Sequence, residues 1–200
     1  MNLRTDAVAA AGAALARLPR YPVGLIHPLS LADGRRVLVR PVLPQDREAE
    51  QLFVMGLSAA SRYRRFHVGL RELPPATLQR LTEIDHFSHV ALVAQAAAAW
   101  ADAGGDDDDD PVIVADARYV RIDDDSAEFA LAVADGWQRQ GLGRRLLEQL
   151  ARHAARHGIR QLHGDVLADN VPMIAMLESM QCELVQRADE PSLLLARVAL

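Results

Sequence analysis

The sequence predicts an α/β domain of three layers, in which helices flank a central mixed sheet. Three observations lead to this prediction. Apolar segments of strand length recur along the chain, amphipathic helical segments interrupt them, and three of the strands follow one another before a last series of helix, strand, helix and strands. This order, with strands and helices intermixed, is typical of a sheet that carries helices on its faces.

Length and composition indicate one soluble domain without a metal, nucleic-acid or membrane function. Two hundred residues can bury a sizeable core, and 50% hydrophobic with 24% charged residues is ordinary for a globular protein. The net charge of −5 gives no overall basic field for nucleic acid, although arginines cluster at 62–65 and 139–145. A single cysteine, Cys182, excludes an internal disulfide and a zinc pattern, and no apolar run is long enough to span a bilayer. We therefore expect a cytoplasmic protein, either a monomer or a homodimer.

The chain is expected to begin with an extension, residues 1–27, followed by the domain at 28–200. Residues 5–18 are alanine-rich and compatible with a short helix. Asp6 and the weak hydrophobicity of this segment argue against an export signal. The first clear strand alternates over residues 36–40 and ends at Pro41, which cannot pair on both sides.

Three helical segments are expected next, each with its own start signal. Pro44 opens the first, which runs through Met55, and Ser58 is a suitable N-cap for the second. Tyr63 and Phe66 lie three positions apart on the second helix. Pro75 is well placed at the first turn of the third, which extends through Ile84.

A pair of strands follows, over residues 89–95 and 111–122, with an acidic segment between them. Residues 96–110 contain an alanine run, two glycines and five consecutive aspartates. Like charges in such a block repel one another and stay solvated, and calcium loops space their carboxylates differently around a turn glycine. We expect a flexible loop insertion here, and a tight turn at 123–125 leading to the next strand.

The chain is organised around the segment that runs from Glu128 to Gly143, which reads as a strand, a glycine-rich turn and the start of a helix. From Arg144 the apolar residues fall on one helical face, and Gly158 is placed to end the helix in a left-handed cap. A helix N-terminus preceded by glycines is a site for a phosphate group, because its N–H groups are free and no Cβ blocks their approach. Arg139, Arg144 and Arg145 add positive charge nearby.

Two common phosphate-binding motifs do not fit this turn. A nucleotide-triphosphatase loop requires Lys followed by Ser or Thr where Arg144 and Arg145 stand, and the dinucleotide fingerprint requires a third glycine at Leu146. After the helix we expect a strand over 161–167, a last helix from Asn170 through Leu177, and terminal strands over 183–187 and 192–198.

The pattern of Gln138, Gly141 and Gly143 after a strand resembles the acyl-CoA pyrophosphate loop of the GNAT superfamily of N-acetyltransferases. The order of elements from about Gly34 to the C-terminus is similar to the GNAT fold, whose central sheet is mixed and mostly antiparallel. Within the superfamily, the chain is most similar to the acetyltransferase domain of bacterial Pat-type protein lysine acetyltransferases. The segments that carry this similarity are 34–41, 57–66, 117–120, 127–129, 133–135 and 169–173.

This resemblance implies an acetyl-CoA-dependent N-acetyltransferase that needs no metal. It implies that Glu128 is the general base, that the backbone of Leu131, Ala132 and Val133 meets the pantetheine arm, and that the loop holds the pyrophosphate through Gln138, Arg139, Gln140, Gly141, Leu142, Gly143 and Arg144. Alternatives remain open from the residues themselves. Glu128 can be a strand-end carboxylate near solvent or paired with an arginine, Asn170 can touch CoA or serve as a helix N-cap, and Tyr63 and Phe66 can wall the acceptor site or pack in the core.

The acceptor implied by the Pat-type segments is a protein lysine, with acyl-CoA synthetases among the candidates. A small-molecule amine acetyltransferase and a non-catalytic acyl-CoA sensor are the alternatives. One departure bears on catalysis, because Leu177 stands where many family members have a tyrosine that protonates the CoA thiolate. A thiol with a pKa of about 8.5 can leave with a proton from water, so the loss does not remove the chemistry. Three further side chains are given structural roles. His153 and His157 are expected one helical turn apart on a solvated face without a third metal ligand, and Cys182 is expected to be a buried small residue.

Overall fold

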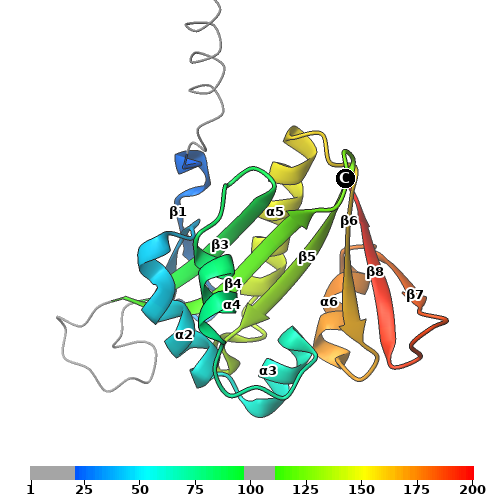
Figure 1. Ribbon diagram of the computed structural model, residues 1–200, viewed down its shortest axis with the longest axis horizontal. Coiled ribbons are helices and arrows are strands. Elements are labelled where there is room, and N and C mark those ends of the chain that lie inside the picture. Colours follow the sequence, from blue (N-terminus) through cyan, green and yellow to red (C-terminus); the bar gives the residue numbers. More distant parts are fainter. Residues whose placement is uncertain (1–20, 97–110) are drawn as a thin grey trace, which may run out of the picture.

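The computed structural model describes residues 21–96 and 111–200 and contains one eight-stranded sheet in the order β1-β2-β3-β4-β5-β6-β8-β7 (Figure 1). Every neighbouring pair is antiparallel except β5 and β6, which are parallel, so the predicted mixed and mostly antiparallel sheet is confirmed. The strands are β1 (His27–Ser30), β2 (Arg36–Pro41), β3 (His89–Ala96), β4 (Val112–Arg121), β5 (Ser126–Val133), β6 (Gln161–Leu167), β7 (Glu183–Gln186) and β8 (Leu193–Ala199).

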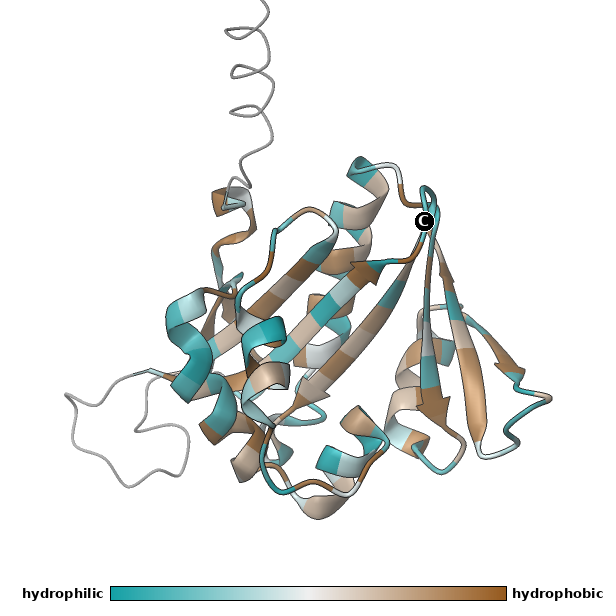
Figure 2. Ribbon diagram, in the orientation of Figure 1, coloured by the Kyte–Doolittle hydropathy of each residue, from teal (hydrophilic) through white to brown (hydrophobic). Residues whose placement is uncertain are grey.

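Helices cover both faces of this sheet, as predicted. The helices are α2 (Arg47–Gly56), α3 (Ala59–Phe66), α4 (Pro75–Thr82), α5 (Leu142–Arg156) and α6 (Val171–Ser179), with short 3-10 turns η1 (Val23–Leu25), η2 (Pro44–Asp46) and η4 (Asp135–Trp137). The core on one face contains the apolar residues of α5 and α6, and the core on the other face contains those of α2 and α4. Strand β3 serves both, because Leu92 belongs to the first core and Val93 to the second. Its unbroken apolar sequence follows from burial on both sides, and Figure 2 shows it as a hydrophobic strand beside the more hydrophilic α2.

The local signals of the sequence explain where several helices begin and end. The Ser58 side chain accepts a hydrogen bond from the Ser61 N–H at 3.1 Å, which is the predicted N-cap of α3. Helix α5 buries Leu146, Leu147 and Leu150 and ends before Gly158, whose φ of +85° is the left-handed cap conformation. The helix begins at Leu142, two residues before the predicted start.

The expected N-terminal extension and acidic loop fall mostly outside the described residues. Residues 1–20 and 97–110 are not described, so neither expectation is tested there. Within 21–27, the chain forms η1 and enters β1, which pairs with β2 from His27 to Ser30. Leu25 of η1 packs in the core of the sheet.

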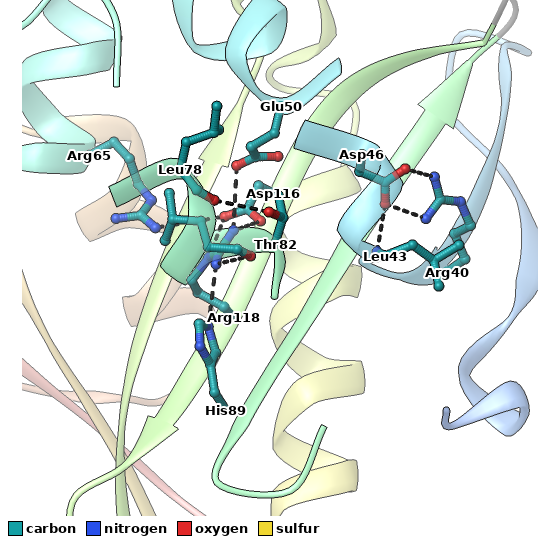
Figure 3. Close-up of polar contacts among 11 residues, drawn as sticks. Arg40, Leu43, Asp46, Glu50, Arg65, Leu78, Thr82, His89, Asp116 and Arg118 are labelled. Atoms are coloured by element: carbon teal, nitrogen blue, oxygen red, sulfur yellow. Dashed lines mark hydrogen bonds and ion pairs between the residues drawn. The ribbon is translucent and has the colours of Figure 1, made fainter. Parts of the chain in front are cut away.

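A cluster of buried charges stabilises the helical layer above β4, and Figure 3 shows its side chains pointing toward one another. The Arg118 guanidinium donates from Nε to Asp116 Oδ1 at 2.9 Å, forms an ion pair with the other Asp116 oxygen, and lies 3.4 Å from Glu50 of α2. It also donates to the Leu81 carbonyl at 2.9 Å. Burial, with the Asp116 carboxylate nearby, raises the pKa of Glu50 to about 8. The cluster therefore joins α2, α4 and β4 through one guanidinium.

Candidate active site

The site lies where β5 and β6 separate, a place that we call the fork. These strands pair only from Ser126 to Glu128 with Gln161 to His163, and beyond that point β6 pairs with β8 alone while β5 continues along β4 (Figure 1). Gly164 lies at the separation, and a Cβ there would lie 2.8 Å from the Phe129 carbonyl oxygen and 3.1 Å from its ring. The close approach is possible because this residue has no side chain.

A cavity of about 600 Å³ occupies this fork. Its lining comes from α3, β5, the turn after β5, the N-terminus of α5, β6 and α6. Among the residues predicted from sequence, those that line it are Phe66, Glu128, Leu131, Ala132, Val133, Gln138, Arg139, Gly141, Leu142, Gly143, Arg144 and Asn170. Tyr63 and Gln140 do not line it, and Tyr63 is 49% exposed.

The N-terminus of α5 opens into the cavity with free backbone donors. The first intrahelical bond runs from the Arg145 N–H to the Gly141 carbonyl at 3.2 Å, so the N–H groups of Leu142, Gly143 and Arg144 have no helical acceptor. Gly141 has a φ of +81°. A Cβ on Gly143 would lie 3.2 Å from the Leu131 side chain, so a larger residue would fill the space between the start of α5 and β5. We call this space the Gly143 cradle. The arrangement suits an anionic ligand such as a phosphate group.

Gln138 and Asp135 hold the turn to α3. Gln138 donates from its amide to the Val133 carbonyl at 3.0 Å and to Ser61 Oγ at 3.3 Å. The Asp135 carboxylate accepts from the Ser58 N–H, the Ser58 hydroxyl and the Ser61 hydroxyl, each at 2.8 Å. Burial alone would raise the pKa of Asp135, but these hydrogen bonds outweigh it and the pKa is lowered. The link between the turn and α3 was missed in sequence reasoning, since its partners are 74 to 77 positions apart.

Glu128 stands at the last paired position of the fork, opposite Val120 on β4 and His163 on β6. Its side chain is exposed to the cavity, and within the described residues it makes no side-chain hydrogen bond or ion pair. This exposure agrees with the alternative of a strand-end carboxylate near solvent, and no arginine pairs with it among the described residues. The separation of β6 leaves this side of β5 open, and the carboxylate is free to meet a ligand in the cavity.

Three further predictions about side chains can be compared with the structure. Asn170 occupies the N-cap position of α6 without a side-chain cap bond and lines the cavity. Leu177 is fully buried in the core, so no side chain enters the cavity from the position that many family members fill with tyrosine. His153 was expected on a solvated face, yet it is buried and its Nδ1 lies 2.9 Å from the Tyr119 hydroxyl.

Three charged residues that the sequence did not assign to the site also line the cavity. Arg64 and Arg65 come from α3, and Asp165 comes from β6. Asp165 forms an ion pair with Arg187 at 2.9 Å. The arginine cluster at 62–65 was visible in the sequence, but nothing local indicated that two of its members face the fork.

Comparison with known proteins identifies the family. The model of the acetyltransferase (GNAT) family matches residues 63–181, which include the end of α3, the fork, the glycine-rich turn and α6. The chain belongs to the GNAT family. An acetyltransferase of Pseudomonas aeruginosa, PA5475, is 35% identical over 145 residues, which cover 72% of this chain and 73% of that protein. The acetyltransferase Pat of Mycolicibacterium smegmatis is 32% identical over 155 residues, and these cover 76% of this chain but 43% of Pat.

Solved structures agree with this assignment. The GNAT domain of S. lividans PAT has a TM-score of 0.78 and 28% identity, with 90% of this chain and all of that chain covered. The protein is thus an acetyltransferase of the GNAT family with a Pat-like domain among its structural neighbours. Among residues 21–96 and 111–200, none of the helices has the length and apolar character required to cross a bilayer. The same residues contain no group of three or more His, Cys, Asp or Glu side chains placed to hold a metal ion.

The cavity fits acetyl-CoA as the acetyl donor of this family. The free N–H groups of α5 and the Gly143 cradle suit a pyrophosphate, and Arg139 and Arg144 line the cavity beside them. On its β6 side, the backbone of β5 beyond Glu128 has no paired strand, which leaves that edge available to an extended ligand.

Proposed function

We propose that this protein is a cytoplasmic acetyl-CoA-dependent N-acetyltransferase that transfers an acetyl group directly to the side-chain amine of a protein lysine. The observation that carries the proposal is the shared cavity: the α5 N-terminus and the Glu128 carboxylate line the same space in the fork. A phosphate-binding end and a free carboxylate in one cavity are what acetyl transfer from CoA to an amine requires. Acyl-CoA synthetases are the first acceptors to test.

The residues then have distinct roles in our proposal. The turn of Gln138 to Arg144 holds the pyrophosphate, chiefly through backbone N–H groups, and the open edge of Leu131 to Val133 binds the pantetheine arm. Gln138 contributes by fixing the turn, since its amide is occupied by Val133 and Ser61. Asn170 contacts CoA at the entrance to α6, and Phe66 forms part of the acceptor wall.

Glu128 removes the proton that the acceptor must lose. A lysine amine with a pKa of about 10.4 is almost wholly protonated at neutral pH, and freeing its lone pair costs about 4–5 kcal/mol at pH 7. Glu128 takes one proton from the lysine ammonium, directly or through water, and the neutral nitrogen then bonds to the acetyl carbon. The carbon–sulfur bond breaks as the thiolate leaves, and the second proton of the nitrogen passes to solvent as the amide forms. With Leu177 in the core, the departing thiolate takes its proton from solvent.

A protein acceptor is supported by the resemblance of the chain to Pat-type enzymes, and a small amine is the competing acceptor. That resemblance includes residues 57–66, part of which lines the cavity, and the match to the M. smegmatis Pat covers 43% of that protein. The test is to incubate the protein with acetyl-CoA and either an acyl-CoA synthetase or a panel of polyamines and amino sugars. We expect one acetyl mass shift on a synthetase lysine with equimolar CoA release. Turnover of small amines alone would overturn the protein acceptor, and CoA binding without turnover of any amine would indicate a sensor.

A further inference from the structure

The wall of the cavity formed by α3 carries two guanidinium groups, Arg64 and Arg65, and within the described residues only Arg65 has a carboxylate partner. Arg65 is largely buried, with 12% of its side chain exposed, and its nearest carboxylate oxygen is Asp116 Oδ1 at 3.7 Å. That distance is too long for a hydrogen bond. Asp116 is already engaged by Arg118 through both oxygens, as Figure 3 shows. Arg65 therefore shares Asp116 with Arg118, and its own ion pair with this carboxylate is a long one.

Arg64 is the adjacent residue and also lines the cavity. In the described part of the chain it forms no ion pair and no side-chain hydrogen bond, although it is only half-exposed. Burial lowers the pKa of Arg65, with Asp116 acting in the opposite direction, but a guanidinium stays charged at neutral pH. The α3 wall thus presents the guanidinium of Arg64, unpaired among the described residues, next to the ion-paired Arg65, to whatever enters from the acceptor side.

The other charges of the cavity are assigned to different tasks. Arg139 and Arg144 stand at the α5 N-terminus, where the cofactor phosphates bind in our account, and Arg144 also pairs with Glu148 at 2.8 Å. Asp165 is neutralised by Arg187, and Glu128 faces the reacting amine. Arg64 is the cavity cation that remains for the acceptor without a partner among the described residues, and Arg65 adds its charge beside it.

We propose that Arg64 and Arg65 select acceptors that carry a carboxylate beside the target amine, namely protein lysines flanked by aspartate or glutamate. This inference rests on the proposed function, because it names the sequence context of the acceptor lysine. Guanidinium groups bind carboxylates through paired, charge-assisted hydrogen bonds, and partial burial reduces the competition from water. Without such a partner, the two cations repel an incoming ammonium group. An acidic flank removes that penalty, whereas a basic flank adds to it.

The test uses peptides with a single lysine whose neighbours are Asp or Glu, Gln or Asn, or Arg, each assayed by CoA release and mass shift. For the wild type we expect kcat/KM to be about tenfold higher with acidic than with neutral flanks, and lowest with Arg. Arg64→Gln should reduce the acidic preference to about threefold or less, and Arg64→Glu should reverse the order of the acidic and basic peptides. The acidic preference of the wild type should also shrink in about 0.5 M salt, since the interaction is partly screened.

Arg71→Glu is the matched control, because Arg71 is exposed, lies outside the cavity lining and undergoes the same charge reversal. It should keep the wild-type order of peptides. CoA affinity should also be unchanged in Arg64→Glu by calorimetry, and a loss there would place Arg64 in the cofactor site and overturn the inference. Equal rates for all three flanks would overturn the selectivity while leaving the proposed function intact. Failure to acetylate any peptide, with small amines still turned over, would overturn the proposed function and this inference with it.

Discussion

Gly164→Ala tests whether the contact at the fork is as tight as the structure indicates. The added methyl group would lie 2.8 Å from the Phe129 carbonyl oxygen and 3.1 and 3.2 Å from two carbons of the Phe129 ring. The closest neighbour is backbone, so a side-chain rotation cannot relieve it. Strand β6 is also paired with β8 along its whole length from Gln161 to Leu167, so moving it away requires β8 to move as well.

We therefore expect the substitution to destabilise the protein by about 1–3 kcal/mol, as for an overpacked core. In a domain of this size, each kcal/mol corresponds to a shift of about 2–4 °C in Tm. Urea unfolding gives the free energy, and the control is Gly56→Ala. Gly56 ends α2, and a methyl group added there would meet no atom within 4 Å, so alanine should be neutral or stabilising by up to about 1 kcal/mol. A Gly164→Ala protein as stable as the wild type would refute the reasoning about the fork.

The cavity and its supports lead to three further predictions. Gly143→Asp should weaken CoA binding at least about tenfold in calorimetry, about 1.4 kcal/mol, because a carboxylate would occupy the cradle at the α5 N-terminus; unchanged affinity in a folded variant would contradict the pyrophosphate assignment. Arg118→Met should cost about 3–5 kcal/mol in urea unfolding, since it leaves the buried Asp116 carboxylate with only its long ion pair to Arg65; a loss below about 1 kcal/mol would show that the cluster is not held by this residue. Asp135→Asn should lower the free energy of unfolding at pH 7. Because the pKa of Asp135 is lowered in the folded protein, the difference in unfolding free energy between variant and wild type should be full above the unfolded pKa of about 3.9 and shrink as the pH falls through the folded pKa. A pH-independent difference in chemical unfolding would argue against this linkage.

Local patterns in the sequence were sufficient for most of the elements. The bounds of β6 match the prediction, the Ser58 cap is formed, and Gly158 ends α5 in the left-handed conformation. Periodicity and capping residues act over a few positions, so they can be recognised from one sequence. The glycine turn could be recognised in the same way, since the conformation of Gly141 and the free N–H groups after it are set by neighbouring residues.

Features that depend on distant parts of the chain could not be predicted. The position of Glu128 at the last pair before β6 diverges from β5 is not indicated by any pattern within β5. The buried pair of Asp116 and Arg118 lies on one face of a strand that otherwise reads as apolar, and its placement requires Glu50 from α2. The bond between His153 and Tyr119 likewise joins a helix to a strand 34 positions away, so the helical pattern alone placed that histidine in solvent.

The most direct test of the account is the pH dependence of Glu128→Gln, which keeps the shape of the side chain and removes the base. With an acceptor lysine peptide near pH 7, we expect the variant to lose about 10²–10⁴-fold in kcat while its CoA affinity is retained. The loss should become smaller as the pH rises toward about 9, because more of the lysine amine is then already deprotonated. Turnover equal to wild type across about pH 6.5–9 would show that another group or solvent removes the proton, and would contradict the role of Glu128.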